Sequence, residues 1–278
     1  VGGGSFGEVY RAQDKRDGQQ VALKKVPVRR GEEGLSVGIW REIKAMQHGE
    51  HHNVVRLLDV IVHGATVVLV MECMRCSLHD VISRQQQPLP LLLQWRLSKG
   101  MLGGLAHLHS LDLLHRDLKP GNVLVSQHGV VKLGDFGLAR LMAKAGEGYS
   151  FQAATRWYRA PEMLYAANTY GKEVDIWSAG CIIAELFNLS PLFPGETDID
   201  QMYKIFHVLG TPDVWMEDWP QVVQLPDYDK IAFSHMPKKN FNLLFCSAPP
   251  SLLDLLSKLL EIAPSKRISA ADALAHPW

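Results

Sequence analysis

Two short runs carry side chains whose types and spacing could do chemistry. The first is HRDLKPGN, from His115 to Asn122, and the second is Asp135-Phe136-Gly137, which begins thirteen residues later. Together they supply a carboxylate that could orient an attacking hydroxyl, cations for developing negative charge, and oxygen ligands for a hard metal ion. Phosphoryl transfer from ATP requires this combination. A lone His-Arg-Asp arises often by chance, whereas the full run with its downstream partner does not.

Each polar side chain of these runs has an expected role. We expect Asp117 to accept or orient the proton of the substrate hydroxyl, and Lys119 to reach the transferred phosphoryl group. Asn122 and Asp135 would supply oxygen ligands to Mg²⁺, which prefers oxygen in octahedral geometry.

The chain opens on a glycine-rich stretch. Gly2, Gly4 and Gly7, followed by Val9, form the pattern G-x-G-x-x-G-x-V, which alone is weak because a plain glycine turn also matches it. A dinucleotide-binding fold would place this pattern between a strand and a helix. Here it runs into the strand expected at Glu8–Ala12, so we expect a flap between antiparallel strands that closes over phosphates.

A lysine in the next expected strand is the candidate phosphate contact. Strand alternation puts Ala22 and Lys24 on one face, so a small residue can lie against a flat base while the ammonium reaches phosphates. A lysine in an apolar strand is costly unless it is paired, and Glu42 in the following helix is the expected partner. The alternative is a solvated edge-strand lysine, a description that fits Lys25 better.

Periodicity divides the chain into a small β-rich unit ending near Met74 and a larger helical unit. A crossing is expected near Cys73–Ser77, and a cleft between two such units is a common small-molecule site. The expected strands are Glu8–Ala12, Val21–Val26, Val54–Val62, Thr66–Glu72, Val123–Val125 and Val130–Leu133. The expected helices are Ser36–Met46, Leu91–Leu111, Val174–Leu189, Leu252–Leu260 and Ala270–Ala275.

Composition bounds the class of protein. The 278 residues are 47% hydrophobic and 21% charged, as in a soluble globular protein. Lys plus Arg and Asp plus Glu number 29 each, so net charge gives no pull toward nucleic acid or membrane. No apolar run reaches the roughly 20 residues of a membrane span, and no secretory leader is recognisable. The chain opens inside the glycine motif, which suggests a start truncated in the protein or in the gene prediction.

Two other clusters could bind metal but are incomplete. Cys73 and Cys76 match C-x-x-C, yet zinc would need a second pair, and the other two cysteines are isolated. Four cysteines in this length indicate a reducing compartment rather than a disulfide scaffold. His48, His51 and His52 lie in a polar loop with no acidic or cysteine ligand, which disfavours a metal site there.

These motifs resemble the eukaryotic protein kinase family over essentially the whole chain. The resemblance implies an α+β, two-lobed fold with an N-lobe at 1–74 and a C-lobe at 75–278, and ATP and Mg²⁺ as cofactors. The position of Lys119 suggests a serine/threonine enzyme. Asp135 opens and Ala160-Pro161-Glu162 closes the activation segment, a span of 28 residues. Asp175 resembles the anchor of the catalytic loop, and Arg267 the buried partner of Glu162.

The run from Thr155 to Glu162 is similar to the cyclin-dependent and MAP kinase branch. So is the long segment after Leu209-Gly210-Thr211-Pro212. The resemblance implies protein substrates with Ser or Thr followed by Pro. Three stretches look like the cell-cycle-related kinase subfamily of the cyclin-dependent kinases: 41–45, 190–195 and 225–231.

The resemblance also places the nucleotide base. Met71 would stand at the back of the adenine pocket, Glu72 and Met74 would offer backbone hydrogen bonds to the base, and Leu124 would lie beneath it. Because such contacts use the backbone, Cys73 needs no chemistry of its own, and we expect it to be partly buried.

Regulation is implied by three arginines. Arg41, Arg116 and Arg140 match positions that grip a phosphorylated activation-loop residue in related kinases, and Ser150 is the matching acceptor for an upstream kinase. Alternatively, the arginines pair with nearby carboxylates. Within the helix that carries Glu42, Gly38 and Trp40 depart from the usual cyclin-binding pattern. An activating partner is therefore expected, either cyclin-like or of another kind.

Three functions compete. A pseudokinase serving as a binding module would have lost chemistry, yet Lys24, Asp117, Asn122 and Asp135 are all present. A small-molecule phosphotransferase is disfavoured by the intact activation segment. We therefore expect an active serine/threonine kinase, without nucleic acid as a partner, located in cytoplasm and nucleus with the cilium as a further site.

Overall fold

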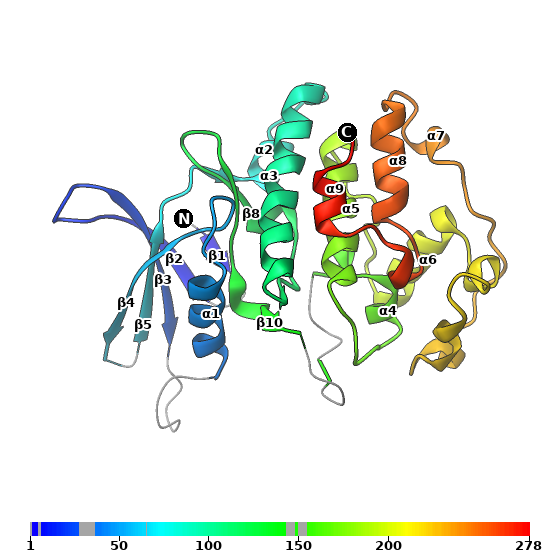
Figure 1. Cartoon of the computed structure of the whole chain (residues 1–278), viewed down its shortest axis with the longest axis horizontal. Helices are drawn as coiled ribbons and strands as arrows, with labels where there is room; N and C mark the ends of the chain where they lie inside the picture. Colours follow the sequence, from blue (N-terminus) through cyan, green and yellow to red (C-terminus); the bar gives the residue numbers. More distant parts are fainter. Residues whose placement is uncertain (1, 5–6, 28–36, 65, 143–147, 150–154) are drawn as a thin grey trace.

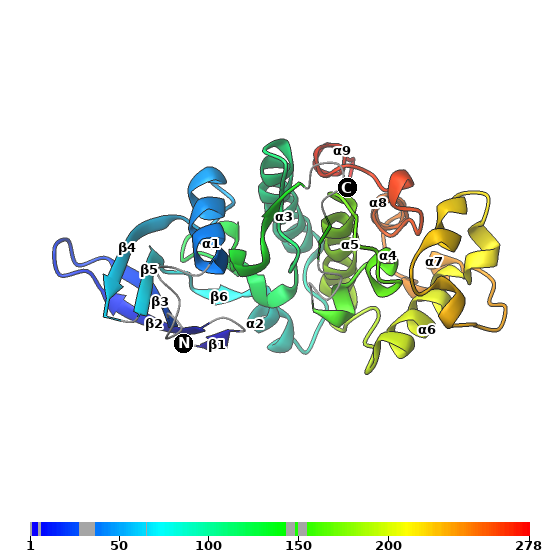
Figure 2. The same cartoon turned by 90° about the horizontal axis from the view of Figure 1, so that it is seen from below.

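The computed structural model describes residues 2–4, 7–27, 37–64, 66–142, 148–149 and 155–278. A small β-rich lobe stands beside a larger helical lobe (Figure 1), so the expected α+β architecture with two lobes is confirmed. The view from below, in Figure 2, shows the same division, with α3 (Leu91–Ser110) and α5 (Glu173–Asn188) inside the helical lobe.

The small lobe is built on one antiparallel sheet of five strands in the order β1-β2-β3-β5-β4. Its alternating strands bury one face and leave the other partly open. The strands are β1 (Gly2–Gly4), β2 (Gly7–Gln13), β3 (Gln20–Pro27), β4 (Leu57–His63) and β5 (Thr66–Glu72).

One helix, α1 (Val37–His48), covers this sheet. Its apolar residues Ile39 and Ile43 recur at helical spacing and pack against Val67 and Leu69 of β5 in a small core of their own. The same helix buries Glu42, which is therefore held facing the sheet. The predicted start at Ser36 lies outside the described residues.

The predicted strand Val54–Val62 begins too early. Strand β4 starts at Leu57, whereas Val54 forms an isolated parallel bridge with Leu133, and the Val55 N–H donates to the Leu133 carbonyl at 2.8 Å. Both valines are buried in the core of the large lobe. The sequence did not show that Val54 and Val55 contact Leu133 while the following residues pair with β5. A run of apolar residues is expected in both cases, because burial in the large lobe and pairing within a sheet give the same hydrophobic pattern.

The large lobe is mainly helical. Its helices are α2 (Leu78–Ser83), α3 (Leu91–Ser110), α4 (Pro161–Leu164), α5 (Glu173–Asn188), α6 (Asp198–Leu209), α7 (Phe241–Leu244), α8 (Pro250–Leu259) and α9 (Ala270–Leu274). The four predicted helices of this lobe correspond to α3, α5, α8 and α9 within one or two residues at most ends. Single 3-10 turns lie at Pro120–Asn122, Phe136–Leu138, Arg156–Tyr158, Pro212–Trp215, Pro220–Gln224, Tyr228–Lys230 and Pro264–Lys266.

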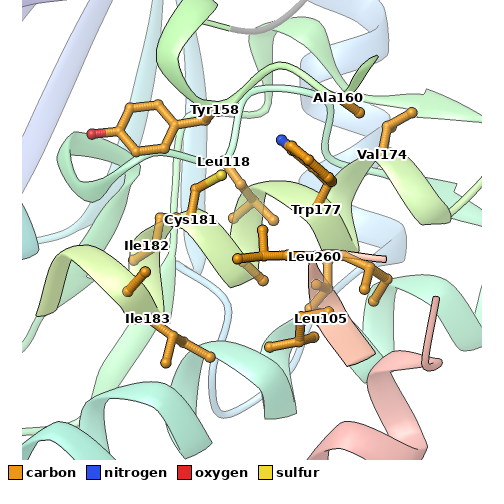
Figure 3. Packing of buried hydrophobic residues seen from close by; sticks show 14 of the residues in the cluster. Leu105, Leu118, Tyr158, Ala160, Val174, Trp177, Cys181, Ile182, Ile183 and Leu260 are labelled. Atoms are coloured by element: carbon orange, nitrogen blue, oxygen red, sulfur yellow. The ribbon is translucent and has the colours of Figure 1, made fainter. Parts of the chain in front are cut away.

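Helix α5 is the centre of the large lobe. Every residue from Val174 to Leu186 is buried, as expected for a helix that is apolar nearly all round. Figure 3 shows Trp177 and Cys181 of this helix near Leu105 of α3, Leu118 of the run from His115 to Asn122, and Leu260, which directly follows α8. The segments that carry the candidate site are thus mounted on a rigid core.

Five short strands flank the residues of the candidate site in the sequence. A three-stranded sheet has the order β6-β8-β9 and a two-stranded sheet pairs β10 with β7. Their bounds are β6 (Cys76–Ser77), β7 (Leu113–Leu114), β8 (Val123–Val125), β9 (Val131–Leu133) and β10 (Arg140–Leu141). The predicted strands Val123–Val125 and Val130–Leu133 correspond to β8 and β9, which pair antiparallel on either side of Gln127-His128-Gly129. Among the described helices, none is long and apolar enough to span a membrane.

Candidate active site

Lys24 joins the two lobes through a buried ionic contact. Its ammonium Nζ donates to Glu42 Oε1 at 2.6 Å and to Asp135 Oδ1 at 2.8 Å. The lysine side chain is 5% exposed, so it is not the solvated edge lysine of the alternative, whereas Lys25 is exposed and lies over the Tyr10 ring. The predicted pairing of Lys24 with Glu42 is confirmed, and Asp135 is its second partner.

Lys24 and Asp135 stabilise each other's charged form, whereas burial raises the pKa of Glu42. Burial works against the charge of Lys24, but the carboxylates of Glu42 and Asp135 outweigh it and raise the pKa of the ammonium. For Asp135, burial alone would raise the pKa, yet the neighbouring Lys24 charge and hydrogen bond lower it. At neutral pH Lys24 is therefore a cation and Asp135 an anion, the forms that phosphate and metal binding need.

The sheet register aligns the glycine stretch with Lys24 across two neighbouring strand pairs. Strand β1 pairs with β2 so that Gly2 faces Val9 and Gly4 faces Gly7, and in the next pair Val9 faces Lys24. The predicted antiparallel flap is confirmed as a backbone arrangement. No helix follows it, which removes the dinucleotide-binding alternative.

The residues predicted to surround the base come from both sheets that flank Asp135, with Ala22 and Met71 on the five-stranded sheet and Leu124 on β8. Ala22 faces Met71 across the β3–β5 pair, and a Cβ added to Gly134, beside Asp135, would meet Leu124 at 3.0 Å. Ala22, Met71, Met74 and Leu124 are all half-buried, as is Val9. These apolar groups therefore keep part of their surface open to solvent.

The Glu72 side chain has a structural task that the sequence did not reveal. Its Oε1 accepts the Arg56 backbone N–H at 2.7 Å and lies 2.8 Å from Lys132 Nζ on β9. The end of β5 is therefore tied through Glu72 to β9, the strand that leads into Asp135. The side chain of Cys73 is half-buried, as predicted.

The Asp117 carboxylate accepts hydrogen bonds from four donors on three residues. Its Oδ2 accepts from Lys119 Nζ at 2.8 Å and from Asn122 Nδ2 at 3.1 Å. Its Oδ1 accepts from both the N–H and the hydroxyl of Thr155, each at 3.0 Å. Thr155 was noted only as the start of the run to Glu162, and its contact with Asp117 was missed because nothing in the local spacing links residues 38 positions apart.

Asp175 anchors the start of the run from His115 to Asn122. This buried carboxylate on α5 accepts the His115 N–H at 2.9 Å, the Arg116 N–H at 2.8 Å and His109 Nε2 at 3.0 Å. Burial would raise the pKa of Asp175, but the His109 hydrogen bond and the other donors lower it, so the carboxylate is ionised. Arg116 has φ of 68°, a left-handed conformation that costs a non-glycine residue about 1–3 kcal/mol, and the Asp175 contacts hold it.

The two chemistry-bearing runs also meet directly. His115 Nε2 lies 3.0 Å from the Gly134 carbonyl, and its Nδ1 accepts the Asp117 N–H at 3.3 Å, which assigns the proton to Nε2. The Gly134 N–H donates to the Asn122 carbonyl at 2.9 Å. Asp117, Asn122 and Asp135 are therefore positioned by one hydrogen-bonded unit.

The donors present fit a hard divalent cation. Asn122 uses its amide nitrogen toward Asp117, at 2.8 Å from the carbonyl, which leaves the amide oxygen as the ligand atom. Asp135 uses Oδ1 toward Lys24, and its side chain keeps 23% exposure. A carboxylate and an amide oxygen form the kind of partial set that Mg²⁺ accepts together with waters and substrate phosphates.

The end of the activation segment is fastened by a buried ion pair. Arg267 donates from its two terminal nitrogens to the two carboxylate oxygens of Glu162, at 2.6 and 2.8 Å. Their side chains are 0% and 5% exposed. The predicted pairing is confirmed, and it links α4 to the segment after α8 beneath the site.

The three arginines proposed to grip a phosphate lie near one another. Burial comes first among the causes that lower the pKa of Arg140, followed by the positive charges of Arg41 and Arg116. Among the described residues no ion pair joins any of these arginines to a carboxylate, so the alternative of carboxylate pairing gains no support. Ser150, the predicted acceptor, lies outside the described residues.

Comparison with known proteins identifies the family. The protein kinase domain family matches residues 1–278, the whole chain. The chain belongs to the protein kinase family. Its relatives include cyclin-dependent kinase 20 of Danio rerio, 46% identical over 280 residues that span 100% of this chain and 81% of that protein.

Other relatives agree on the branch. Cyclin-dependent kinase 20 of Homo sapiens is 43% identical over 280 residues, covering 100% of this chain and 80% of that protein. Cyclin-dependent kinase 7 of Dictyostelium discoideum is 44% identical over 282 residues, covering 100% and 77%. This kinase is thus a protein serine/threonine kinase of the cyclin-dependent type, and the resemblance seen in the sequence is confirmed. Nothing favours the pseudokinase alternative.

Proposed function

We propose that this kinase transfers the γ-phosphoryl group of Mg-ATP to a serine or threonine hydroxyl, with Asp117 orienting the hydroxyl. The observation that carries the proposal is the position of the Asp117 carboxylate, which contacts Lys119, Asn122 and Thr155 and belongs to the same hydrogen-bonded unit as Asp135. A carboxylate fixed by several donors can hold a hydroxyl in line while the proton leaves.

The remaining polar groups have complementary tasks. Lys24, set by Glu42, would bind the nucleotide phosphates, and Lys119 would offset the charge that develops on the transferred group. Asn122 and Asp135 would hold Mg²⁺, which supplies charge neutralisation and orientation of the phosphates when bound. Positioning and electrostatics of this kind account for most of the catalysis in phosphoryl transfer.

Nucleotide recognition would use the partly buried apolar groups around Lys24. Gly2, Gly4 and Gly7 would close over the phosphates, with Val9, Ala22 and Leu124 against the base. Met71 would limit the depth of the pocket, and the backbone at Glu72 and Met74 would provide its hydrogen bonds. The division between lobes would then fall at residues 74 and 75, in the link between β5 and β6.

The preference for Ser or Thr followed by Pro is part of the proposal. Its support is the run from Thr155 to Glu162, in which Thr155 contacts Asp117 while Arg156 and Arg159 both contact Asp198 at the start of α6. The segment is thereby held at both ends beside the phosphoryl-transfer residues. The relatives include cyclin-dependent kinases, the branch whose resemblance implied this preference.

An activating subunit and an upstream kinase complete the proposal. Helix α1 carries Glu42 on its buried face, while Val37 and Trp40 on it are 61% and 49% exposed, which suits an apolar partner surface. A cyclin-like or other subunit bound there could set Glu42 against Lys24. Phosphorylation of Ser150 would add charge opposite Arg41, Arg116 and Arg140. We place the protein in cytoplasm and nucleus, and in the cilium as a further site.

The substrate preference is tested with two peptides that differ only in Pro or Ala after the serine. We expect a kcat/KM ratio of about 100 in favour of the proline peptide, the size of effect that one well-formed contact provides. Equal rates on the two peptides would keep the kinase activity and overturn the proline preference. Transfer to neither peptide, in protein phosphorylated at Ser150 and supplied with a cyclin, would contradict the proposed function itself.

A further inference from the structure

Arg116 has an unusual environment for a buried cation. The residue is 4% exposed, and its Nε has no hydrogen-bond partner among the described residues. No described carboxylate forms an ion pair with it. A buried guanidinium without such a partner is costly, so some other group must stabilise it.

Two tyrosine rings lie against the guanidinium of Arg116 and can stabilise its charge. The guanidinium carbon of Arg116 lies 5.2 Å from the ring centre of Tyr149 and 5.7 Å from that of Tyr170. The two rings themselves are 4.9 Å apart and tilted by 30°. Both distances are within the range of cation–π attraction, which is stronger for a desolvated cation than for an exposed one.

Both rings are firmly placed. The Tyr149 N–H donates to the Asn168 carbonyl at 2.6 Å, and its hydroxyl donates to the Leu141 carbonyl at 2.9 Å. Tyr170 is half-buried, and burial, more than any charge, raises its pKa to about 12. Tyr149 is therefore tied to the loop before α5 through its backbone and to the end of β10 through its hydroxyl, while its ring faces Arg116.

The position of Arg116 links these rings to chemistry. Its backbone N–H is bound to Asp175, and the next residue is Asp117, whose carboxylate is proposed to orient the substrate hydroxyl. Arg140 is close enough for the charge of Arg116 to act on it. Mutual repulsion in this cluster would displace Arg116 unless the rings, or an anion, held it.

We infer that Tyr149 and Tyr170 form an aromatic clamp that positions Arg116, and through it Asp117, before the activation segment is phosphorylated. The inference rests on the proposed function, because it explains how the same site is kept in order without a phosphate. When a phosphate binds the arginines, it takes over the stabilisation of Arg116. Tyr149 and Tyr170 are positioning residues in this scheme and touch no substrate.

The test compares ring-keeping with ring-removing substitutions in a Ser150→Ala background. Tyr149→Phe and Tyr170→Phe keep the π face, whereas Tyr149→Leu and Tyr170→Leu remove it. We expect each leucine variant to lower kcat about tenfold with KM for ATP unchanged, while each phenylalanine variant stays within about twofold. Tyr203→Leu, which removes an exposed ring on α6, is the matched control and should leave kcat unchanged.

A second arm uses protein with Ser150 intact and phosphorylated. There the loss caused by Tyr149→Leu should shrink to less than about threefold, because the phosphate now holds Arg116. An equal loss in the two phosphorylation states would mean that the ring serves folding alone, and would overturn the clamp. Equal losses for the leucine and phenylalanine variants would overturn it too.

The clamp is also tested without any turnover. Hydrogen exchange of the Arg116 Nε–H, followed by NMR, should be about tenfold faster in Tyr149→Leu than in Tyr149→Phe. If the two rates are equal, the clamp is wrong whatever the activity. If the phosphorylated wild type transfers no phosphate while the exchange rates differ, the proposed function fails and the clamp stands.

Discussion

Lys24 on β3 and Asp135 after β9 are separated by 111 positions in the chain, yet the ammonium of one lies 2.8 Å from a carboxylate oxygen of the other. Glu42 on α1 holds the same ammonium at 2.6 Å. The sheet, the helix and the proposed metal ligand therefore meet at one buried cation. Any shift of α1 or of the Asp135 segment changes the environment of Lys24.

Lys24 and Lys25 give a matched pair of substitutions. Lys24→Met should lower kcat/KM about 100-fold, because loss of the cation also releases Glu42 and Asp135 from their positions. Lys25→Met, one residue away on the exposed face, should change it less than twofold. Steady-state kinetics with Mg-ATP and a peptide decide the matter, and equal effects of the two substitutions would contradict the assignment.

The Glu162–Arg267 pair should behave as a single unit in unfolding. Arg267→Met alone leaves a buried, uncompensated carboxylate and should cost about 3–5 kcal/mol of unfolding free energy. Adding Glu162→Leu should recover part of that loss, since the desolvated charge is then gone. Denaturant titrations of the two single variants and the double variant measure the coupling. Strict additivity of the three values would show that the ion pair is unimportant.

The lowered pKa of Asp175 should make the unfolding free energy depend on pH. Its folded pKa lies below the unfolded value of about 3.9, so the unfolded chain takes up the proton first as the pH falls. The stability that this carboxylate contributes is thus complete above about pH 4 and is lost as the pH drops through the folded pKa. Asp175→Asn should therefore lower the unfolding free energy by a constant amount from pH 6 to 8.

The same comparison at acid pH completes that test. The gap between wild type and Asp175→Asn should narrow below about pH 4, because the wild-type carboxyl is then neutral as well. The exposed Asp229→Asn serves as the control and should follow the wild type throughout. A gap that widens toward acid pH would mean that the carboxyl is protonated in the folded protein.

Much of this site follows from the sequence because its residues are consecutive. Asp117, Lys119 and Asn122 occupy one short run, and strand alternation alone places Ala22 beside Lys24. The pairing of Lys24 with Glu42 could be predicted because a buried charge needs a partner, whereas the pairing of Glu162 with Arg267 was implied only by the family resemblance.

What the sequence did not reveal depends on tertiary contacts between segments that are far apart in the chain. The Thr155 hydroxyl has no charge that calls for a partner, so its bond to Asp117 left no signal. The contact of the Glu72 side chain with Lys132 left no local signal either, because the two residues are 60 positions apart in the chain. Val54 and Val55 read as the start of β4, although they belong to the large lobe through Leu133. In each case the deciding partner lies more than ten residues away.

The most direct test of the account is phosphoryl transfer from radiolabelled Mg-ATP by wild type and Asp117→Asn, with the affinity for a non-hydrolysable ATP analogue measured on the same preparations. The substitution removes a carboxylate that contacts Lys119, Asn122 and Thr155 but leaves the Lys24–Asp135 contact in place. We predict that kcat falls by about 10²–10⁴ while the analogue binds within about threefold of wild type. Undiminished transfer by Asp117→Asn would contradict the proposal that this carboxylate orients the substrate hydroxyl.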